Sequence, residues 1–475
     1  MSARWLALCG VALPLAGCVS VGPDYRPPDR FAGVAWIDAT KDATPERNEN
    51  EQNPFPAWWD GFGDALLSSY IERAARDNRA VQAAEARVER AQALRRSVRA
   101  EAGPKVNAEA GVTRRRESRS LSDGDDDRGY RTAYDLGLSA SWELDLFGGV
   151  RRAGEAAVAR VEGEVERRRA VLLAVQAEVA RNYFAVRGAQ KRIAITRANI
   201  DLQSKTYALI ENLRRFGEAS EFDLSRARGQ LQLTQSRLPA LDAEVRAGIH
   251  RLSILLGETP GALLAELEAP AALPALPDLA PLGQGSDLLR RRPDIRAAER
   301  ALAAATADIG AATADLFPRF DLLGGLGRTG ATVDDLRSSL STRYLGAGFI
   351  RWPVFQSGQI RAGIQAEKAE AREAAALYEQ TVLEALADAE TALVRYMSQR
   401  ETKAMLRDAV ASRQRSVALA RQLFESGEEN FLAVLDAERE LISAEDELVN
   451  TETDAVLALV TLYTALGGGW ELFEE

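Results

Sequence analysis

Histidine and cysteine are almost absent from this sequence: its 475 residues include one histidine, His250, and two cysteines, Cys9 and Cys18. These residue types supply most zinc and haem ligands and most nucleophilic catalytic sites. A lone histidine beside apolar helical positions is usually structural, and Gly324 and Gly327 lie inside a strand pattern rather than in a phosphate-binding loop. We therefore expect that the protein is not an enzyme and binds no metal ion and no cofactor.

Excess positive charge and long hydrophobic runs are also missing. The 60 lysines and arginines against 70 aspartates and glutamates give a formal net charge of −10. No basic stripe with interleaved aromatic residues is present, which excludes a nucleic-acid partner. No segment holds about 20 consecutive apolar residues, so no helix is expected to span a membrane. The 46% of hydrophobic residues nevertheless predict a folded chain. If the chain crosses a membrane, it must do so with strands.

The N-terminal segment is typical of a bacterial lipoprotein. Arg4 gives a short positive region, an apolar stretch follows, and small residues precede Cys18, as in a secretory signal. The run Leu-Ala-Gly-Cys that ends at Cys18 resembles a lipobox, in which the cysteine is lipidated and becomes the mature N-terminus. We expect a signal peptide over residues 1–17 and a lipidated, extended segment over 18–63. An ordinary secretory signal with a chance cysteine is the alternative.

The composition of most of the chain favours long helices. Residues 65–102 are rich in Ala, Glu and Arg without an internal proline, which predicts one long helix. A second helix is expected to open at Gly148-Gly149 and run to Arg215, and a third to run from near Ser220 to Leu256, with a turn over 216–220 between them. Apolar residues recur every seven positions in the third helix and predict a coiled-coil seam, while Pro239 should kink or locally break it. The seam residues are Leu224, Leu231, Leu238, Val245 and Leu252.

Two segments change to the period of a strand. In residues 106–113 and 134–145, apolar and polar side chains alternate, which predicts strands of about ten residues with one apolar face. A shift of 210 residues superimposes Tyr134 on Tyr344 and repeats the helical pattern. The sequence therefore predicts two similar repeats, each with a helix, two strands and a long helical hairpin. The expected bounds are 64–261 for the first repeat, 262–285 for a linker, 286–466 for the second repeat and 467–475 for a C-terminal tail.

Four strands per chain limit what a membrane form could look like. Four strands cannot close a barrel, and open sheet edges are not tolerated in lipid, so several chains would have to share one barrel. The helices are too polar for lipid and would project into water. A barrel continued by helical hairpins is a tube suited to conducting solutes outward. The alternative is a non-channel periplasmic coiled-coil lipoprotein, a scaffold whose sheet packs on a soluble core.

Five spaced segments carry a family resemblance. They are Gly22 to Pro27 after the lipobox, Trp142 to Gly148, Arg291 to Ile295, Leu435 to Arg439, and Ala465 to Trp470. Together they resemble the outer-membrane factor family, which is TolC-like, and within it the NodT-type efflux lipoproteins. The resemblance implies a mainly α fold with a membrane β-barrel. In it, a homotrimer shares a twelve-stranded barrel that continues as a barrel of long α-hairpins with an equatorial domain.

The resemblance also implies a function. Members of this family are outer-membrane exit ducts of tripartite efflux pumps, and they pass small molecules passively from the periplasm to the outside. The implied partners are outer-membrane lipid, a periplasmic adaptor (membrane fusion) protein and an inner-membrane transporter of the RND or ABC type. The implied location is the bacterial outer membrane, with a lipid anchor and a periplasmic helical extension. A duct for type I protein secretion is the alternative within the family, and the lipobox favours efflux.

The two hairpin turns are the positions at which the resemblance implies docking to the adaptor. Each turn contains a glycine, and a glycine that ends a helix needs no partner. Both interpretations can hold, because an adaptor would grip a turn of this kind. The residues concerned are Arg215, Phe216, Gly217 and Ser220 in the first turn, and Phe424, Gly427 and Asn430 in the second.

A periplasmic gate is the second site that the resemblance implies. Leu432 and Asp436 match the apolar residue and the aspartate that narrow this end of the channel in the family, with Arg439 beside them. Their spacing of four places Leu432 and Asp436 on one helical face, and three copies would ring the axis. A carboxylate ring favours cations, and a leucine ring blocks a pore by dewetting. The alternative is a solvated pair between Asp436 and Arg439.

Overall fold

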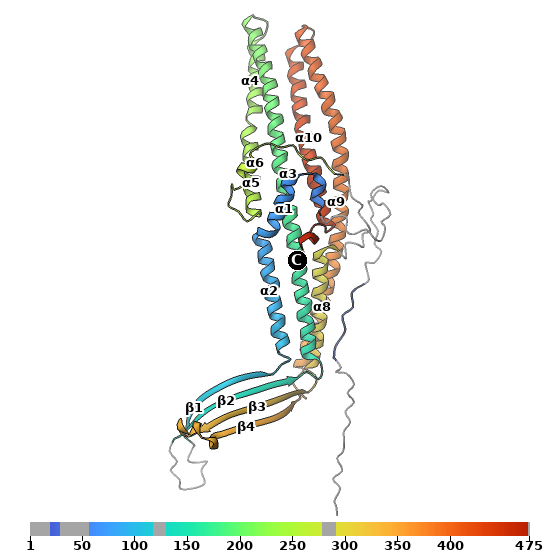
Figure 1. Ribbon diagram of the computed structural model, residues 1–475. Helices are drawn as coiled ribbons and strands as arrows, with labels where there is room; N and C mark the ends of the chain where they lie inside the picture. Colours follow the sequence, from blue (N-terminus) through green and yellow to red (C-terminus); the bar gives the residue numbers. More distant parts are fainter. Residues whose placement is uncertain (1–19, 29–56, 117–129, 278–290, 474–475) are drawn as a thin grey trace, which may run out of the picture. The chain divides into compact units, whose positions relative to one another are not determined.

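A computed structural model describes residues 20–28, 57–116, 130–277 and 291–473 (Figure 1). The expected signal peptide and Cys18 lie outside the described residues. The chain forms two compact units, each made of three separate stretches of sequence. Unit one comprises Met1–Pro27, Glu89–Gly163 and Ala298–Tyr378, and unit two comprises Pro28–Val88, Glu164–Ala297 and Glu379–Glu475.

Unit one contains a four-stranded antiparallel sheet whose strands lie side by side in sequence order (Figure 1). The expected strands are confirmed. Among the described residues β1 pairs only with β2, and β4 only with β3, so β1 and β4 form the two edges. The 3-10 helices η5 (Asp334–Arg337) and η6 (Ser339–Ser341) connect β3 to β4. The strands are β1 (Lys105–Arg115), β2 (Arg131–Leu144), β3 (Arg319–Gly330) and β4 (Thr342–Arg351).

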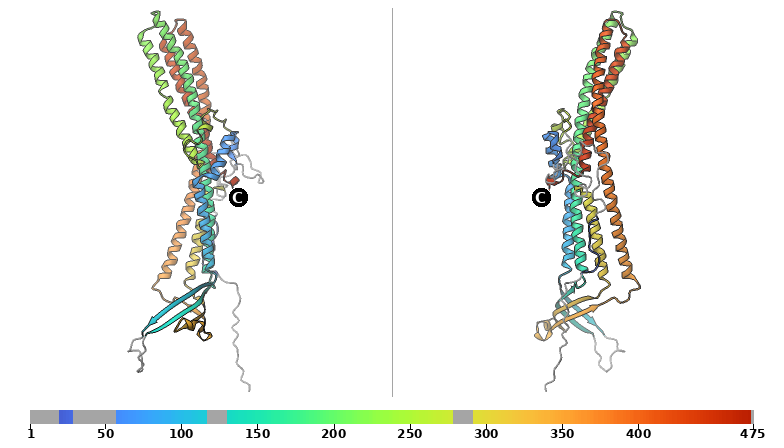
Figure 2. Two further views of the ribbon diagram at one scale, coloured as in Figure 1. Left: turned by 60° about the vertical axis from the view of Figure 1, so that its left-hand side comes forward. Right: turned by 90° about the vertical axis from the view of Figure 1, so that its right-hand side faces the viewer.

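The α-helices account for most of the chain, as the composition predicts. Two of them, α3 and α9, have 67 residues each and are drawn as long unbroken ribbons in both views of Figure 2. None of the helices in the described parts of the chain is long and apolar enough to cross a membrane. The helices are α1 (Ala65–Asp77), α2 (Arg79–Ala100), α3 (Gly149–Arg215), α4 (Glu221–Gln235), α5 (Leu238–Leu255), α6 (Leu264–Leu267), α8 (Pro293–Ala314), α9 (Gln359–Glu425) and α10 (Phe431–Ala465).

The prediction of a single helix over residues 65–102 is wrong, because α1 ends at Asp77 and α2 begins at Arg79. Asn78 between them has an extended backbone, with φ −66° and ψ 129°. Its side-chain oxygen accepts from the backbone N–H groups of Ala80 and Val81, which caps α2. Its side-chain nitrogen donates to the carbonyl of Leu255 at 2.7 Å. The break therefore combines a local cap with a contact to a residue 177 positions away.

The predicted break at Pro239 is confirmed. α4 ends at Gln235 and α5 begins at Leu238, so the proline occupies the first turn of α5, where its missing N–H costs nothing. The seam of the returning helices is buried at its two ends and partly buried at Leu231, Leu238 and Val245. Leu224 is 3% exposed and Leu252 is fully buried, so the heptad spacing identifies the packed face correctly.

Unit two contains two joints at which one helix ends against the start of another. At the first joint, Asn78 binds the Leu255 carbonyl at the end of α5. At the second joint, the Arg292 guanidinium donates to the Ala465 carbonyl at the end of α10, at 3.2 Å. A glycine with positive φ follows each helix end, Gly257 at 77° and Gly467 at 74°. The backbone of Asp77 lies close to Gly257, and that of Arg292 lies close to Gly467. A Cβ atom on either glycine would crowd these backbone atoms.

An aromatic core closes unit two around the C-terminal residues. Trp58 stacks on Tyr463 with ring centroids 5.6 Å apart. Trp470 is 6% exposed and donates from its indole nitrogen to the Arg291 carbonyl. The guanidinium of Arg169 lies 4.6 Å from the Trp470 ring centroid. These contacts bring the motif that ends at Trp470 together with the motif that begins at Arg291, just before α8.

Candidate functional site

One face of the sheet is largely apolar and the other is mixed, with Leu323, Leu345 and Phe349 among its polar residues, and large side chains on both faces are exposed. Leu138, Leu326 and Tyr344 are cross-strand neighbours on the apolar face and are 53%, 60% and 87% exposed. Residues beside them in sequence point to the opposite face, where Asp135 accepts from Thr329 and lies 3.8 Å from Arg343. A sheet on a soluble core would bury its apolar face. This sheet presents that face outward.

Two tryptophans lie at the same end of the sheet, near the C-terminal ends of β2 and β4. The indole nitrogen of Trp142 in β2 donates to the Ala102 carbonyl at 2.8 Å. The indole nitrogen of Trp352, just after β4, donates to the Leu316 carbonyl at 3.1 Å. Both side chains are more than one third exposed. Tryptophan with a bonded N–H and an exposed ring is typical of a boundary between lipid and water.

The first hairpin turn joins α3 to α4 and exposes an aromatic side chain. Gly217 has φ 80°, and the Glu218 N–H donates back to the Leu213 carbonyl, which ends α3. Ser220 caps α4 in a reciprocal pair of hydrogen bonds with Asp223. Phe216 is 81% exposed. An aromatic side chain so exposed at a rigid turn has the properties of a binding residue.

The second hairpin turn joins α9 to α10 by the same backbone design with different side chains. Gly427 has φ 78°, and Asn430 caps α10 by accepting from the Ala433 N–H at 3.2 Å. Phe424 and Phe431 pack against each other, with ring centroids 5.9 Å apart. Phe431 is 6% exposed and belongs to the core, and Phe424 is partly buried against the same cluster. The expected adaptor-docking residues therefore lie at the two turns, but only the first turn exposes a phenylalanine.

The two hairpins pack on each other just behind their turns. Ile210 of α3 and Leu224 of α4 form one apolar cluster with Phe431 and Val434 of α10. Since this cluster joins elements that are more than 200 residues apart, the positions of the two turns depend on one another.

The proposed gate residues lie on the solvent-facing side of α10. Leu432 is 39% exposed. The Asp436 carboxylate lies 3.9 Å from the Arg439 guanidinium, and both side chains are more than half exposed. Within one chain this is the solvated pair that an i, i+3 couple usually forms. The gate needs a ring of symmetry-related copies and stays a prediction.

Sequence reasoning misses a series of glutamates on α10, of which two are buried and the middle one is partly buried. Glu438 is 1% exposed, and its carboxylate accepts from Arg421 at 2.6 Å and from Thr206 at 2.8 Å. Two more glutamates follow at intervals of seven, each bonded to α3 on one side and to α9 on the other. The spacing of seven is the signal that could have revealed them. The three sets are Glu438 with Thr206 and Arg421, Glu445 with Asn199 and Gln414, and Glu452 with Lys191 and Arg407.

The last of these glutamates sits in a cluster of cations. Lys191 approaches the Glu452 carboxylate at 2.5 Å, Arg407 at 3.4 Å and Lys403 at 3.9 Å. Burial lowers the pKa of the Lys403 ammonium, with Glu452 acting in the opposite direction. A carboxylate shared by three cations ties α10 to both neighbouring helices.

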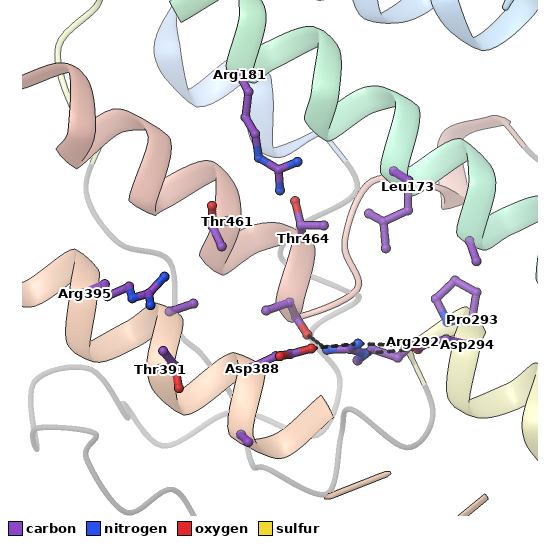
Figure 3. Close-up of a pocket in the computed structure, with 15 residues that line it drawn as sticks. Leu173, Arg181, Arg292, Pro293, Asp294, Asp388, Thr391, Arg395, Thr461 and Thr464 are labelled. Atoms are coloured by element: carbon purple, nitrogen blue, oxygen red, sulfur yellow. Dashed lines mark hydrogen bonds and ion pairs between the residues drawn. The ribbon is translucent and has the colours of Figure 1, made fainter. Parts of the chain in front are cut away.

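A cavity of about 540 Å³ lies beside the second joint (Figure 3). Arg292 is at its edge and pairs with Asp294 at 2.7 Å and Asp388 at 3.5 Å, so its charge is already compensated. Pro293 begins α8, where its missing N–H is harmless. The Arg-Pro-Asp motif therefore builds the joint between α10 and α8. The cavity walls come from α3, α8, α9 and α10.

Comparison with known proteins agrees with this architecture. The chain matches the family described as outer membrane efflux protein over residues 70–258 and 285–468. It is 32% identical over 466 residues to the solvent efflux pump outer membrane protein SrpC of Pseudomonas putida, with 98% of each chain covered. It is 29% identical over 462 residues to the probable outer membrane lipoprotein SilC of Salmonella typhimurium, with 96% of each covered. The solved structure of the outer-membrane channel OprN has a TM-score of 0.88 and 38% identity, over 95% of this chain and 100% of OprN.

Proposed function

Because this chain belongs to the outer membrane efflux protein family, we propose that it forms the exit duct of a tripartite efflux pump. The duct passively conducts small molecules from the periplasm to the outside and performs no catalysis. One observation carries the proposal: the apolar face of the sheet is exposed, and β1 and β4 are open edges. Unpaired backbone groups at such edges are costly in lipid, so the sheet requires further strands.

Three copies of the chain supply those strands. Pairing β4 of one copy with β1 of the next, three times, closes a twelve-stranded barrel without edges. The apolar face with Leu138 and Leu326 then contacts lipid. The opposite face, with Asp135 and Arg343, lines a water-filled interior. The division into repeats at 64–261 and 286–466 assigns two strands and one helical hairpin to each repeat, which the similar lengths of α3 and α9 support.

A lipid on Cys18 anchors the chain to the outer membrane. The Leu-Ala-Gly-Cys run supports this modification, and so does the relationship to SilC, which is described as an outer membrane lipoprotein. Residues 1–17 are removed as a signal peptide in this proposal.

The two hairpin turns contact the periplasmic adaptor, through which the duct is coupled to an RND or ABC transporter in the inner membrane. The exposure of Phe216 supports the first turn as the main apolar contact. Arg215, Gly217 and Ser220 shape that turn, and Gly427 and Asn430 shape the second, beside Phe424. Leu432, Asp436 and Arg439 form the periplasmic gate, and their exposure on α10 supports an orientation toward the channel axis.

Conductance of the purified protein in planar lipid bilayers tests the proposal. A duct gives discrete single-channel openings, and cells that lack the gene accumulate a pump substrate. A periplasmic scaffold gives neither conductance nor accumulation. Loss of a secreted protein, with normal small-molecule export, would instead identify the type I secretion duct.

A further inference from the structure

The segment Ser20–Pro27 contains a Gly-Pro-Asp-Tyr motif to which the proposed function gives no task. It begins two residues after Cys18 and runs over the surface of unit one. We call this segment the strap. Most of its residues are exposed, yet Val21 and Tyr25 are partly buried against the body of the unit.

The first contact of the strap is with the turn between β2 and α3. The Val21 N–H donates to the Phe147 carbonyl at 3.2 Å. Gly148 has φ 80°, and a Cβ atom there would lie 2.6 Å from the Ser20 hydroxyl oxygen. The strap can lie on this turn only because residue 148 has no side chain.

Arg152 of α3 holds the middle of the strap. Its side chain is 7% exposed. It donates from Nε to the Val21 carbonyl at 3.1 Å, and from Nη2 to the Asp24 carboxylate at 2.7 Å. The hydrogen bond to Asp24 raises the pKa of the guanidinium above its ordinary value, as expected for a charge-assisted pair. Arg152 is buried and donates several hydrogen bonds to the exposed strap, so it is the residue on which the strap docks.

Two glycines allow the strap to approach α8. A Cβ atom on Gly22, which has φ 94°, would lie 2.4 Å from the Gly310 Cα atom. A Cβ atom on Gly310 would lie 2.8 Å from the Arg152 Cγ atom and 3.0 Å from the Val21 carbonyl oxygen. The backbones of the strap and α8 are therefore in direct contact, and a side chain at either position separates them.

Tyr25 fixes the far end of the strap. Its ring packs on a small cluster made by Ala159 of α3 with Ala303 and Ala304 of α8. Its hydroxyl donates to the Glu299 carboxylate. Burial raises the pKa of this hydroxyl, and the bond to Glu299 acts in the same direction, so Tyr25 stays a protonated donor.

The strap thus connects the two repeats where their strands meet the helices. Phe147 lies between β2 and α3, and α8 leads through Phe317 into β3. The rings of Phe147 and Phe317 stack with centroids 4.7 Å apart. Since β2 pairs with β3 across the repeat boundary, the strap contacts the turn that follows β2 and the helix that leads into β3, the two central strands of the sheet.

We propose that the strap is an assembly staple. When it is seated on Arg152 and Gly310, it holds the connections to β2 and β3 together and fixes the point at which the lipidated N-terminus leaves the folded body. The sheet then enters the membrane only after the strap has docked. This inference rests on the proposed function in two respects, the lipid on Cys18 and the membrane insertion of the sheet.

The test uses the full-length, lipidated chain expressed in cells and compares Arg152→Ala with Arg160→Ala. Arg160 also links α3 to α8, through Asp308 at 2.5 Å, but it has no contact with the strap among those described. Two quantities are measured: the rate of chymotrypsin cleavage after Tyr25, and the amount of oligomer that needs detergent for its release from the outer membrane. The mass of the N-terminal peptide establishes that Cys18 is lipidated in each variant.

For Arg152→Ala, we expect cleavage about tenfold faster and inserted oligomer reduced to about a tenth, because charge-assisted hydrogen bonds shift such equilibria about tenfold or more. Arg160→Ala should leave both quantities near the wild-type values. Faster cleavage with a normal amount of inserted oligomer would overturn the proposal, and so would unchanged cleavage.

A second variant, Gly22→Ala, keeps the test valid if Arg152→Ala misfolds. It changes the strap alone and should reproduce both effects with the helical circular dichroism unchanged. Normal insertion of Gly22→Ala despite a released strap would equally overturn the proposal. Failure of the wild-type protein itself to insert as an oligomer would refute the proposed function, which is a different result.

Discussion

Two helical hairpins can be compared: one consists of α3, α4 and α5, and the other of α9 and α10. Their first helices have the same length, but their returning helices differ. α3 and α9 begin at Gly149 and Gln359 and end at Arg215 and Glu425, 210 residues apart at both ends (359 − 149 and 425 − 215). The returning helix is broken between Gln235 and Leu238 in the first hairpin and continuous over 35 residues in the second. Pro239 in the first hairpin corresponds to Val449 in the second. Pro239, in the first turn after the break, is therefore one difference that accounts for the interrupted returning helix.

The largest effect on stability is expected when a proline is placed at the equivalent position of the second hairpin. Val449→Pro should destabilise the protein by about 4 kcal/mol, because proline removes a hydrogen bond, clashes with the preceding turn and replaces a buried valine. Val449 is 1% exposed. The matched variant Pro239→Ala should change stability by less than about 1 kcal/mol. Thermal unfolding followed by circular dichroism in detergent checks both, and equal destabilisation would show that the proline does not cause the break.

The phenylalanines at the turns should give the next largest difference. Phe431→Ala should cost about 3 kcal/mol, because its ring is buried between the hairpins. Phe216→Ala should leave stability within about 0.5 kcal/mol, since its side chain is 81% exposed. Only Phe216→Ala should lose efflux at full stability, as measured by substrate accumulation in cells. Normal efflux in that variant would remove the first turn from the adaptor contact.

The two helix joints should respond differently to the same substitution. Gly257→Ala should cost about 2 kcal/mol or more, because positive φ strains alanine and its Cβ would lie 2.4 Å from the Asp77 carbonyl oxygen. Gly467→Ala should cost about 1 kcal/mol, because the nearest atoms of Arg292, its Cγ at 3.1 Å and its backbone Cα and N at 3.2 Å, lie farther from the Cβ position. Midpoints of thermal unfolding give the ranking, and the reverse order would contradict this description of the joints.

The gate variants should change stability least and conductance most. Leu432→Ala combined with Asp436→Ala should raise the closed-state single-channel conductance in bilayers, because both side chains are partly exposed and narrow the entrance in the proposed ring. The corresponding residues of the first hairpin, 210 positions earlier, are Phe222 and Arg226. Phe222→Ala with Arg226→Ala is the matched control and should leave conductance unchanged. Equal conductance in the two double variants would refute the gate.

The sequence predicts features that depend on local pattern. Helix α3, the break at Pro239 and the four strands follow from composition, from one proline and from period-two alternation. The break at Asn78 is different, because it lies within a run of helix-forming residues and depends on the Leu255 carbonyl far along the chain. The junction of α10 with α8 depends on Arg292 in the same way.

The candidate sites also contain some features that the local sequence predicts and others that depend on long-range contacts. The sequence alone predicts that Gly217 and Gly427 lie at the hairpin turns, because glycine commonly ends a helix. Both residues lie there in the structure and have positive φ. That Phe216 is exposed while Phe424 packs on Phe431 follows from the way the two hairpins meet, which no local pattern encodes. The burial of Glu438 and the docking of the strap on Arg152 are long-range contacts of the same kind.

The mass of the protein extracted from the outer membrane tests the central claim most directly. The mature, lipidated protein is released from the outer-membrane fraction with a mild detergent and measured by native mass spectrometry. Three lipidated chains in one complex, released only by detergent, is the result expected if the exposed apolar sheet and its two open edges belong to a shared barrel. A monomer that dissolves in water once its lipid has been removed would contradict the channel and leave a periplasmic scaffold.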